Sequence, residues 1–288
     1  MISIIIPTHN RPGLLRLCLE SLTRLDYPKE QFEVIVVNDG GDQDLSAIVE
    51  PVSKIINIRL INQRKAGPAT ARNTGVSNSN GQFIAFTDDD CTPAADWLTA
   101  LASRLQHNPS RMYGGHTVNA LEGNTYSAAS QSLVDYLYGY ADAHRDHARF
   151  FTSNNIAMAR NMFESVGGFD TSFPGACGED RELCDRWLGL GHEMSFVPEA
   201  RVFHHHHLTL RTFCKQHFNY GAGAFLFRRC RARRGLAPLR FEPPAFYLGL
   251  LGHGWKEQRL RSVPHSALML LSQLANVVGF GWAKFFNR

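Results

Sequence analysis

The sequence lacks the short motifs that identify several common classes of protein. No G-x-G-x-x-G follows its first apolar run and no G-x-x-x-x-G-K-[ST] occurs anywhere, which disfavours a dinucleotide fold and a P-loop. Its six cysteines include no C-x-x-C pair, and its N-terminus has no charged segment followed by an apolar one. We therefore expect a reducing, cytoplasmic setting with neither a disulfide framework nor a structural zinc site.

Acidic residues are scarce in the last part of the chain. Residues 1–200 carry 16 basic and 24 acidic side chains, a net charge of −8, whereas residues 201–288 carry 14 and 2, a net charge of +12. A basic segment can meet anionic lipid, nucleic acid or an acidic partner. No nucleic-acid-binding motif is present, and the aromatic and aliphatic content favours lipid. We expect no nucleic-acid partner and a peripheral contact with the inner face of an anionic membrane.

Strand-like and helix-like segments alternate over the first 90 residues. Four apolar runs typical of buried strands span residues 2–6, 32–37, 56–61 and 83–88, and helical patterns include 14–22 and 69–79. This alternation predicts an α/β fold with a mostly parallel central sheet and helices on both faces. A chain of 288 residues, 44% of them hydrophobic, can bury such a core.

Three consecutive carboxylates, Asp88, Asp89 and Asp90, end the fourth run. They repel one another unless positive charge lies between them. In an extended segment Asp88 and Asp90 would project together while Asp89 points away, a D-x-D arrangement that suits Mg²⁺ or Mn²⁺. The alternative is a turn, with Thr92 and Pro93 starting a helix whose cap lies near Asp90.

The other predicted strands also end in polar residues. Residues 7–11 follow the first strand, Asp39 the second, and Lys65 with Arg72 the third. Ligands of parallel sheets bind at the carboxyl ends of the strands, where these groups would converge. Asp39 could accept hydrogen bonds from a base or ribose, although a turn-forming Asn-Asp-Gly-Gly explains it equally well. Lys65 and Arg72 could offset diphosphate charge, although a lone basic residue is more often a solvated surface group.

In this order, the strand ends resemble the nucleotide-sugar half of glycosyltransferase family 2 enzymes, which have a GT-A fold. The resemblance covers about the first 110 residues and rests on the ordered set Ile4–Arg11, Val36–Gly40, Gly67–Gly75 and Phe86–Asp90. It implies that the nucleoside is held by Pro7, Thr8, Asn10, Arg11 and Asp39. It implies further donor contacts from Lys65, Arg72, Asp88 and Asp89, and a metal site formed by Asp88 and Asp90.

A second group of polar residues lies between residues 154 and 186. Leu183 and Trp187 mark one face of a predicted helix whose first turn contains Glu179 and Asp180, where the helix dipole favours carboxylates whatever their role. The Gly-Gly-Phe-Asp and Gly-Glu-Asp segments resemble the acceptor-side signature of the same family, which implies that Asp180 is the catalytic base. We expect acceptor contacts from Glu179, Asn155 and Gly115.

Histidines and aromatic residues suggest three further features. The segment 197–204 resembles the family pattern Val-Pro-x-Ala-x-Val-x-His, which implies that His204 completes the metal site. His206 would face the same side of a strand and competes for this role, and two-carboxylate sites also work without histidine. His144 and His147 have a spacing that a shared metal would allow, but a solvated helix face is the favoured interpretation. Tyrosines in 132–138 could line an acceptor pocket or a core.

The end of the chain combines arginines with apolar helices. Five arginines lie within 228–234, and the apolar segments 245–251 and 267–286 follow. The second nears bilayer-spanning length, but its polar interruptions and flanking basic residues fit an interfacial helix better. A helix docked on the catalytic domain is the alternative. We predict a GT-A catalytic domain over 1–220, with a nucleotide-sugar half over 1–110 and an acceptor half over 111–220, and a basic helical extension over 221–288.

The resemblance implies an inverting transfer of a sugar from a nucleoside diphosphate to the hydroxyl of a glycan or lipid-linked acceptor. The setting would be bacterial-type synthesis of a polysaccharide, glycolipid or cell-surface glycan, and the cofactor Mn²⁺ or Mg²⁺. Two alternatives stay open. A metal-dependent nucleotidyltransferase would release pyrophosphate and would usually carry a Gly-rich basic loop, unlike Pro7–Gly13. A non-catalytic nucleotide-sugar-binding module would not need Asp180.

Overall fold

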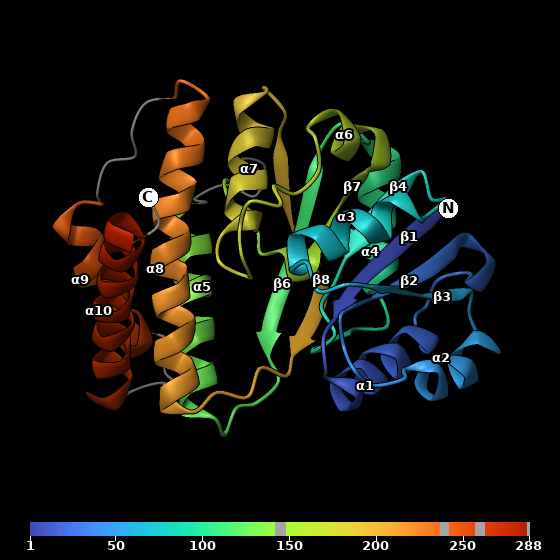
Figure 1. Ribbon diagram of the computed structural model, residues 1–288, viewed down its shortest axis with the longest axis horizontal. Helices are drawn as coiled ribbons and strands as arrows, with labels where there is room; N and C mark the ends of the chain where they lie inside the picture. Colours follow the sequence, from blue (N-terminus) through green and yellow to red (C-terminus); the bar gives the residue numbers. More distant parts are fainter. Residues whose placement is uncertain (142–147, 237–241, 257–262, 287–288) are drawn as a thin grey trace. The chain divides into compact units, whose positions relative to one another are not determined.

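The structure, a computed structural model, describes residues 1–141, 148–236, 242–256 and 263–286 (Figure 1). The chain divides into two compact units, which we call unit 1 and unit 2. Unit 1 consists of Met1–Ala120, Asp142–Gly175 and Asp180–His205, and unit 2 of Leu121–Ala141, Ala176–Glu179 and His206–Arg288. His144 and His147 lie outside the described residues.

Unit 1 is built on one β-sheet, whose eight strands in the described residues have the order β3-β2-β1-β4-β7-β6-β8-β5. The strands are β1 (Ile2–Thr8), β2 (Phe32–Asp39), β3 (Ile58–Gln63), β4 (Phe83–Phe86), β5 (Cys91–Pro93), β6 (Met112–Asn119), β7 (Ile156–Ala159) and β8 (Met194–His204). The first four are parallel, as the alternating pattern predicted (Figure 1). β6 and β8 are also parallel, whereas β7 is antiparallel to β4 and β6, and β5 to β8.

The alternation of side chains along β1 places them in two layers of helices. Ile2, Ile4 and Ile6 belong to a buried core shared with α1 (Pro12–Thr23), α2 (Ser46–Ser53) and α4 (Trp97–His107). On the other face, α3 (Pro68–Ser77) packs so closely that a Cβ atom at Gly75 would overlap the side chain of Ile5. The sheet is therefore covered on both faces. The remaining helices of this part of the chain are short and are η1 (Lys29–Gln31), η2 (Ser153–Asn155), α6 (Arg160–Ser165) and α7 (Glu179–Gly189).

Unit 2 is helical in its described residues and contains α5 (Thr125–Ala141), α8 (Leu210–Arg233), α9 (Pro244–Lys256) and α10 (Val263–Phe286). Its core includes Leu133, Phe213, Leu250 and Met269. The hydroxyl of Tyr136 on α5 donates to the carbonyl of Phe246 at 2.7 Å, and the two rings are in contact. The aromatic face of α5 therefore packs against α9 in the core of unit 2. Residue 220, the predicted end of the catalytic domain, lies within the continuous helix α8, which begins after the capping box at Thr209.

A buried carboxylate joins the three strands β1, β2 and β3. Glu33 is 1% exposed and accepts hydrogen bonds from the Ser3 hydroxyl at 2.7 Å, the Asn80 backbone N–H at 2.5 Å and the Arg59 guanidinium at 3.0 Å. Although burial opposes ionisation, these donors lower the pKa of Glu33. The carboxylate is thus ionised at neutral pH and satisfied by partners from both neighbouring strands.

Replacement of Glu33 should destabilise unit 1. Glu33→Ala leaves the buried Ser3 hydroxyl and the partly buried N–H of Asn80 without their acceptor, which we expect to lower the free energy of unfolding by about 2–4 kcal/mol. The matched control is Glu50→Ala, an exposed position on α2, where we expect a change within about 0.5 kcal/mol. Urea unfolding at pH 7 measures both variants, and an equal effect would contradict a structural role for the Glu33 network.

Candidate functional site

Three acidic residues follow β4 in a turn rather than in an extended strand. The backbone turns at Asp89 and Asp90, so the period of two that applies to strands does not apply here. The expectation that Asp88 and Asp90 project together while Asp89 points away is therefore wrong. Asp89 and Asp90 contact the same side chain, Arg11, whereas Asp88 contacts Arg72.

Two arginines from separate segments supply positive charge to the carboxylates. Arg11, in the loop after β1, places Nη1 2.9 Å from Asp90 Oδ2 and 3.3 Å from Asp89 Oδ1. Arg72 on α3 is 3% exposed and donates to Asp88 Oδ1 at 2.7 Å. These pairs meet the requirement, evident from the sequence, that cationic groups lie among the three acids. Arg11 and Arg72 belong to the predicted set of donor-binding residues.

Asp89 is a buried carboxylate with a raised pKa. It is 4% exposed, and the Thr8 hydroxyl donates to its Oδ2 at 2.7 Å. Burial and the adjacent charge of Asp90 raise the pKa of Asp89 to about 7, although Arg11 and Thr8 favour the ionised form. A proton on Asp89 is thus one means by which the cluster limits its own repulsion near neutral pH.

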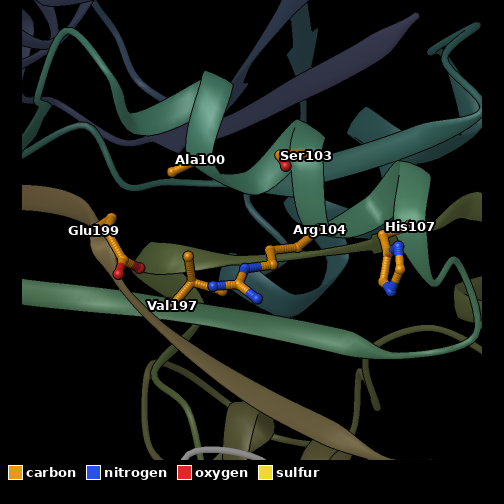
Figure 2. Close-up of a pocket in the computed structure, with 6 residues that line it drawn as sticks. All are labelled: Ala100, Ser103, Arg104, His107, Val197 and Glu199. Carbon is orange, nitrogen blue, oxygen red and sulfur yellow. The ribbon is translucent and has the colours of Figure 1, made fainter.

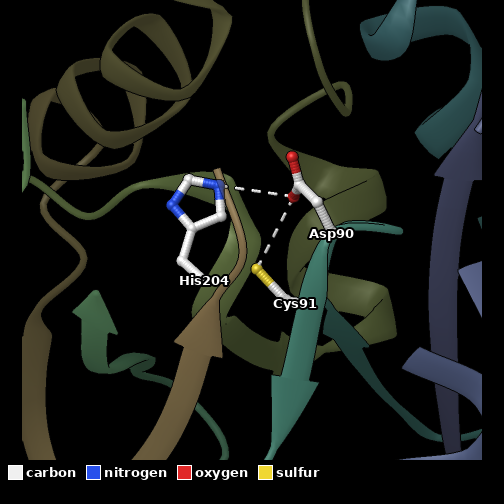
Figure 3. A group of neighbouring side chains, drawn as sticks. All are labelled: Asp90, Cys91 and His204. Atoms are coloured by element: carbon white, nitrogen blue, oxygen red, sulfur yellow. Dashed lines mark hydrogen bonds and ion pairs between the residues drawn. The ribbon is translucent and has the colours of Figure 1, made fainter. Parts of the chain in front are cut away.

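The pairing of β5 with β8 brings His204 to Asp90. In this antiparallel pair Cys91 lies opposite His204. The imidazole Nε2 of His204 is 3.3 Å from Asp90 Oδ1, and Cys91 Sγ is 3.9 Å from the same oxygen (Figure 3). The three potential ligand atoms all lie within 4.8 Å of one another. Burial opposes protonation of His204, but the Asp90 carboxylate outweighs it and raises the pKa of the imidazole.

The neighbouring residues fix this corner of the sheet. Thr92 and Pro93 belong to β5, so the alternative of a helix beginning there is wrong. The His205 backbone N–H donates to the Asp90 carbonyl at 2.7 Å, and its Nε2 lies 3.0 Å from the Thr92 hydroxyl oxygen. His204 therefore lies against the acidic cluster, whereas the competing His206 belongs to unit 2.

A chain of contacts connects Asp88 with α7. Arg72, which holds Asp88, lies with its guanidinium carbon 5.4 Å from the ring of Phe169. The adjacent Asn73 exchanges hydrogen bonds with the Phe169 backbone at 2.8 and 2.9 Å. On the other side of this turn, Arg186 of α7 donates to the Gly168 carbonyl at 2.6 Å and pairs with Glu182. Helix α3 and the body of α7 are thereby held to one turn.

The first residues of α7 have different environments. Glu179 is 2% exposed, and its Oε2 accepts hydrogen bonds from the backbone N–H groups of Cys177 and Gly178 at 2.9 and 3.1 Å. This carboxylate stabilises the turn before the helix, so we assign it no acceptor contact. Asp180 is half-buried and its Oδ1 accepts from the Arg181 N–H at 2.7 Å. Asp180 is the more accessible carboxylate of the pair.

The predicted nucleoside-binding residues lie at the ends of β1 and β2. Asp39 is 5% exposed and accepts from the backbone N–H groups of Ala66 and Gly67 at 2.7 and 2.8 Å, which fixes the loop before α3. Gly67, the N-cap residue directly before α3, has φ +91°, a conformation that favours glycine. In the same loop, Lys65 Nζ lies 3.0 Å from His9 Nε2.

The loop after β1 is pinned to the loop after β2. Pro7 is buried in the last part of β1, and Asn10 is exposed with φ +53°. Asparagine adopts this left-handed conformation more readily than most residues. Its side-chain oxygen accepts from the Asp42 N–H at 3.0 Å. Pro7, Thr8, Asn10, Arg11 and Asp39 thus lie on adjacent parallel strand ends, as the sequence predicted for a nucleotide site.

Two residues expected to bind the acceptor occupy the core instead. Asn155 is 1% exposed, accepts a hydrogen bond from Trp97 Nε1 at 2.8 Å and donates to the Ala200 carbonyl at 2.9 Å. A Cβ atom at Gly115 would overlap that same carbonyl. The amide and the glycine therefore serve close packing of β6 and β8, and we assign them no acceptor-binding role.

A surface depression of about 560 Å³ lies elsewhere on unit 1, between α4 and β8 (Figure 2). It is lined by Ala100, Ser103, Arg104, His107, Val197 and Glu199. Its lining includes none of the predicted site residues. The depression is a feature of the α4 surface, whereas the acidic cluster lies at the strand ends.

Sequence reasoning missed two contributors to the site. Cys91 follows Asp90 directly in the sequence, but its place opposite His204 depends on the pairing of β5 with β8. Arg186 was not singled out, although the i,i+4 spacing from Glu182 is a recognisable signal for an ion pair on one helix face. The contact of Arg186 with the turn at Gly168 had no local signal.

The raised pKa of Asp89 predicts a specific dependence of stability on pH. Asp89 binds its proton more tightly in the folded protein, so stability should fall by up to about 4 kcal/mol as the pH rises from about 4 to about 7. Asp89→Asn should remove this decline and be more stable than the parent at pH 8. Exposed Asp96→Asn is the control. Urea unfolding in EDTA at pH 5.5 and 8 checks this, and an equal loss for Asp89→Asn at both pH values would contradict it.

Comparison with known proteins identifies the family. Residues 3–167 match the model of glycosyl transferase family 2, and residues 140–208 match a model described as the N-terminal domain of galactosyltransferase. Glycosyltransferase AglE of Haloferax volcanii is 27% identical over 202 residues, covering 69% of this chain and 65% of that protein. The pre-mycofactocin glycosyltransferase of Mycobacterium tuberculosis is 29% identical over 228 residues, covering 77% and 46%. The chain thus matches between about half and two thirds of these curated relatives' length.

A solved structure shares the fold. The mannosyltransferase PcManGT from Pyrobaculum calidifontis, in complex with GDP-Man and Mn²⁺, superposes with a TM-score of 0.69 at 16% identity, over 100% of this chain and 87% of that one. This likeness confirms the predicted GT-A fold. Because residues 3–167 of the 288 match the family model, the protein belongs to glycosyl transferase family 2.

Proposed function

We propose that this protein transfers a sugar from a nucleoside diphosphate sugar to the hydroxyl of a glycan or lipid-linked acceptor, with inversion at the anomeric carbon. The observation that carries the proposal is the acidic cluster at the ends of parallel strands, held by Arg11, Arg72 and His204. Such a cluster beside basic side chains suits a diphosphate whose charge must be balanced. The family membership supports the same reaction class.

The donor site would use the strand ends of β1, β2 and β4. Pro7, Thr8, Asn10 and Arg11 would contact the nucleoside together with Asp39, whose loop they adjoin. Asp88 and Asp89 would contact ribose or diphosphate. Arg72 holds Asp88 in place at 2.7 Å, so the carboxylate is positioned before the donor arrives. Lys65, at the next loop, would add positive charge near the diphosphate.

The donor set fits a hard divalent cation. Asp90 supplies a carboxylate oxygen and His204 an imidazole nitrogen within 4.8 Å of each other. Asp88, which pairs with Arg72, would supply a second carboxylate from two residues earlier in the chain. These residues would hold Mn²⁺ or Mg²⁺, and PcManGT was solved with Mn²⁺. When bound, the cation stabilises negative charge on the leaving diphosphate. Arg11 balances the charge of Asp89 and Asp90 on the protein side.

Asp180 would act as the base. Inversion is a single displacement, so the acceptor hydroxyl must lose its proton as it attacks the anomeric carbon from the face opposite the diphosphate. Asp180 lies in the first turn of α7, where the helix dipole favours an ionised carboxylate, and it is half-buried. Glu179 is engaged with the preceding backbone, which supports Asp180 as the residue that takes the proton.

The reaction itself can be tested with a panel of donors. The protein is incubated with UDP-, GDP- and dTDP-sugars and Mn²⁺, and nucleoside diphosphate and pyrophosphate are both measured. Release of nucleoside diphosphate supports glycosyl transfer. Pyrophosphate would instead indicate a nucleotidyltransferase, and donor binding without either product would indicate a binding module.

The metal ligands can be tested by binding alone. Asp90→Ala and His204→Ala should each weaken the affinity for Mn²⁺ in the presence of GDP or UDP by at least about tenfold, because each removes a ligand. Cys91→Ala is the matched control and should keep the affinity, since Mn²⁺ prefers oxygen and nitrogen over thiol ligands. Isothermal titration calorimetry measures all three, and unchanged affinity for Asp90→Ala would remove Asp90 from the metal site.

The base can be separated from donor binding. Asp180→Asn should keep donor and metal affinity but lower kcat by at least about a hundredfold, because the amide preserves the shape but cannot accept the proton. Asp185→Asn, on the same helix, is the matched control and should keep kcat. Glu179→Gln should lower the free energy of unfolding, and it should lower kcat less than Asp180→Asn does. Near-normal transfer by Asp180→Asn with a confirmed donor and acceptor would exclude Asp180 as the base.

A further inference from the structure

Helix α10 has one face committed to the protein. Met269, Ser272 and Ala283 are fully buried. The backbone of α10 approaches α8 so closely that a Cβ atom at Gly279 would overlap the Phe218 carbonyl. This face is therefore fixed within unit 2 by small residues that allow close helix packing.

The opposite face of α10 is apolar and exposed. Leu270, Leu274, Val277, Val278 and Phe285 are 51% to 69% exposed. At 100° per residue their directions fall within an arc of about 100°, so they form a single stripe. We call these five residues the outer stripe. A contiguous apolar stripe on a solvent-exposed face is typical of an interaction site.

Positive charge lies beside the outer stripe. Neither α8 nor α10 contains an acidic residue, and the last two turns of α8 carry Arg228, Arg229, Arg231 and Arg233. The guanidinium carbon of Arg228 lies 5.6 Å from the ring of Phe280 on α10. The basic end of α8 therefore adjoins the end of α10 where Trp282 and Phe285 are exposed. Exposed aromatic residues next to basic ones are typical of helices at a membrane interface.

We propose that the outer stripe binds the surface of an anionic lipid bilayer, with α10 lying in the plane of the interface. The proposal goes beyond the transfer reaction and does not depend on it. Apolar side chains would enter the acyl region while arginines of α8 meet the lipid phosphates. The outer stripe and the arginines of α8 would thus contact the hydrocarbon and the anionic headgroups of the bilayer, respectively.

Two other occupants fit the observations less well. Pro264–Phe286 is long and apolar enough to cross a membrane, with a mean hydropathy of 1.3, and 22% of its most apolar stretch is buried. Spanning would require the buried face, with Ser272 and Gly279, to leave α8 and meet lipid. A second copy of this chain would bring the same arginines and no acidic residue on α8 or α10, so like charges would oppose the contact.

Sedimentation of the full chain with vesicles tests the proposal without donor, metal or acceptor. Vesicles contain phosphatidylcholine alone or with one quarter phosphatidylglycerol. The parent should bind the anionic vesicles, and Leu274→Glu with Val278→Glu should weaken binding at least about tenfold, because two apolar anchors are lost. Leu190→Glu, at a residue 57% exposed directly after α7, is the matched control and should bind like the parent. Equal binding of the parent and the double variant would overturn the proposal.

Two further measurements separate the alternatives. Arg229→Gln and Arg233→Gln should each weaken binding about fivefold at low salt and less at high salt. Quenching of Trp282 by lipids brominated near the headgroup should exceed quenching by lipids brominated deep in the chain, with Trp282→Phe giving the background. Stronger deep quenching would indicate a spanning helix. A second copy would be indicated if the parent does not bind vesicles but self-associates in analytical ultracentrifugation, and if the Leu274→Glu, Val278→Glu variant does not self-associate. Evidence for a spanning helix or for a second copy would overturn the proposal.

Discussion

The repulsion among three adjacent carboxylates is the constraint on which the site depends. Asp88, Asp89 and Asp90 leave the sheet together, and each is balanced by a different means. Asp88 pairs with Arg72 of α3, and Asp90 pairs with Arg11 and His204. Asp89 pairs with Arg11, and its raised pKa favours a proton that reduces its negative charge. Because these partners come from a loop, a helix and a distant strand, neutralising the acids requires the parallel half of the sheet and β8 to be in place at once. Electrostatics and topology therefore specify the same arrangement.

Local sequence patterns predicted the parts of the fold that depend on local physics. The β-branched runs and the helical spacing between them led to the parallel strands, and polar residues at the strand ends marked the edge where they converge. The direction of Asp89 could not be predicted, because it depends on a turn that interrupts the strand. Asn155 was a misleading candidate, because its side-chain amide is hydrogen-bonded to Trp97 and to the Ala200 carbonyl. Such partners are set by tertiary packing.

The turn at Gly168 and Phe169 lies between the helix that positions Asp88 and the helix of the proposed base, and it contacts both. One side of the turn is bound by α3, which positions Asp88, and the other by Arg186 of α7, the helix that begins next to Asp180. Glu182 keeps Arg186 in a fixed orientation, since a two-pronged guanidinium contact is rigid. Packed groups and hydrogen bonds therefore connect the donor-side helix with the helix of the proposed base.

The pairing of β5 with β8 has a consequence for when the site can form. The hydrogen bond between Thr92 and His205 joins residues 113 apart in the chain, and His204 meets Asp90 through the same pairing. Closing the intervening loop costs conformational entropy before contacts of such long sequence separation can form. During synthesis, the strands β1 to β4 emerge from the ribosome with Asp90 lacking its imidazole partner. The proposed cation site, with His204 beside Asp90, is therefore complete only once β8 has joined the sheet.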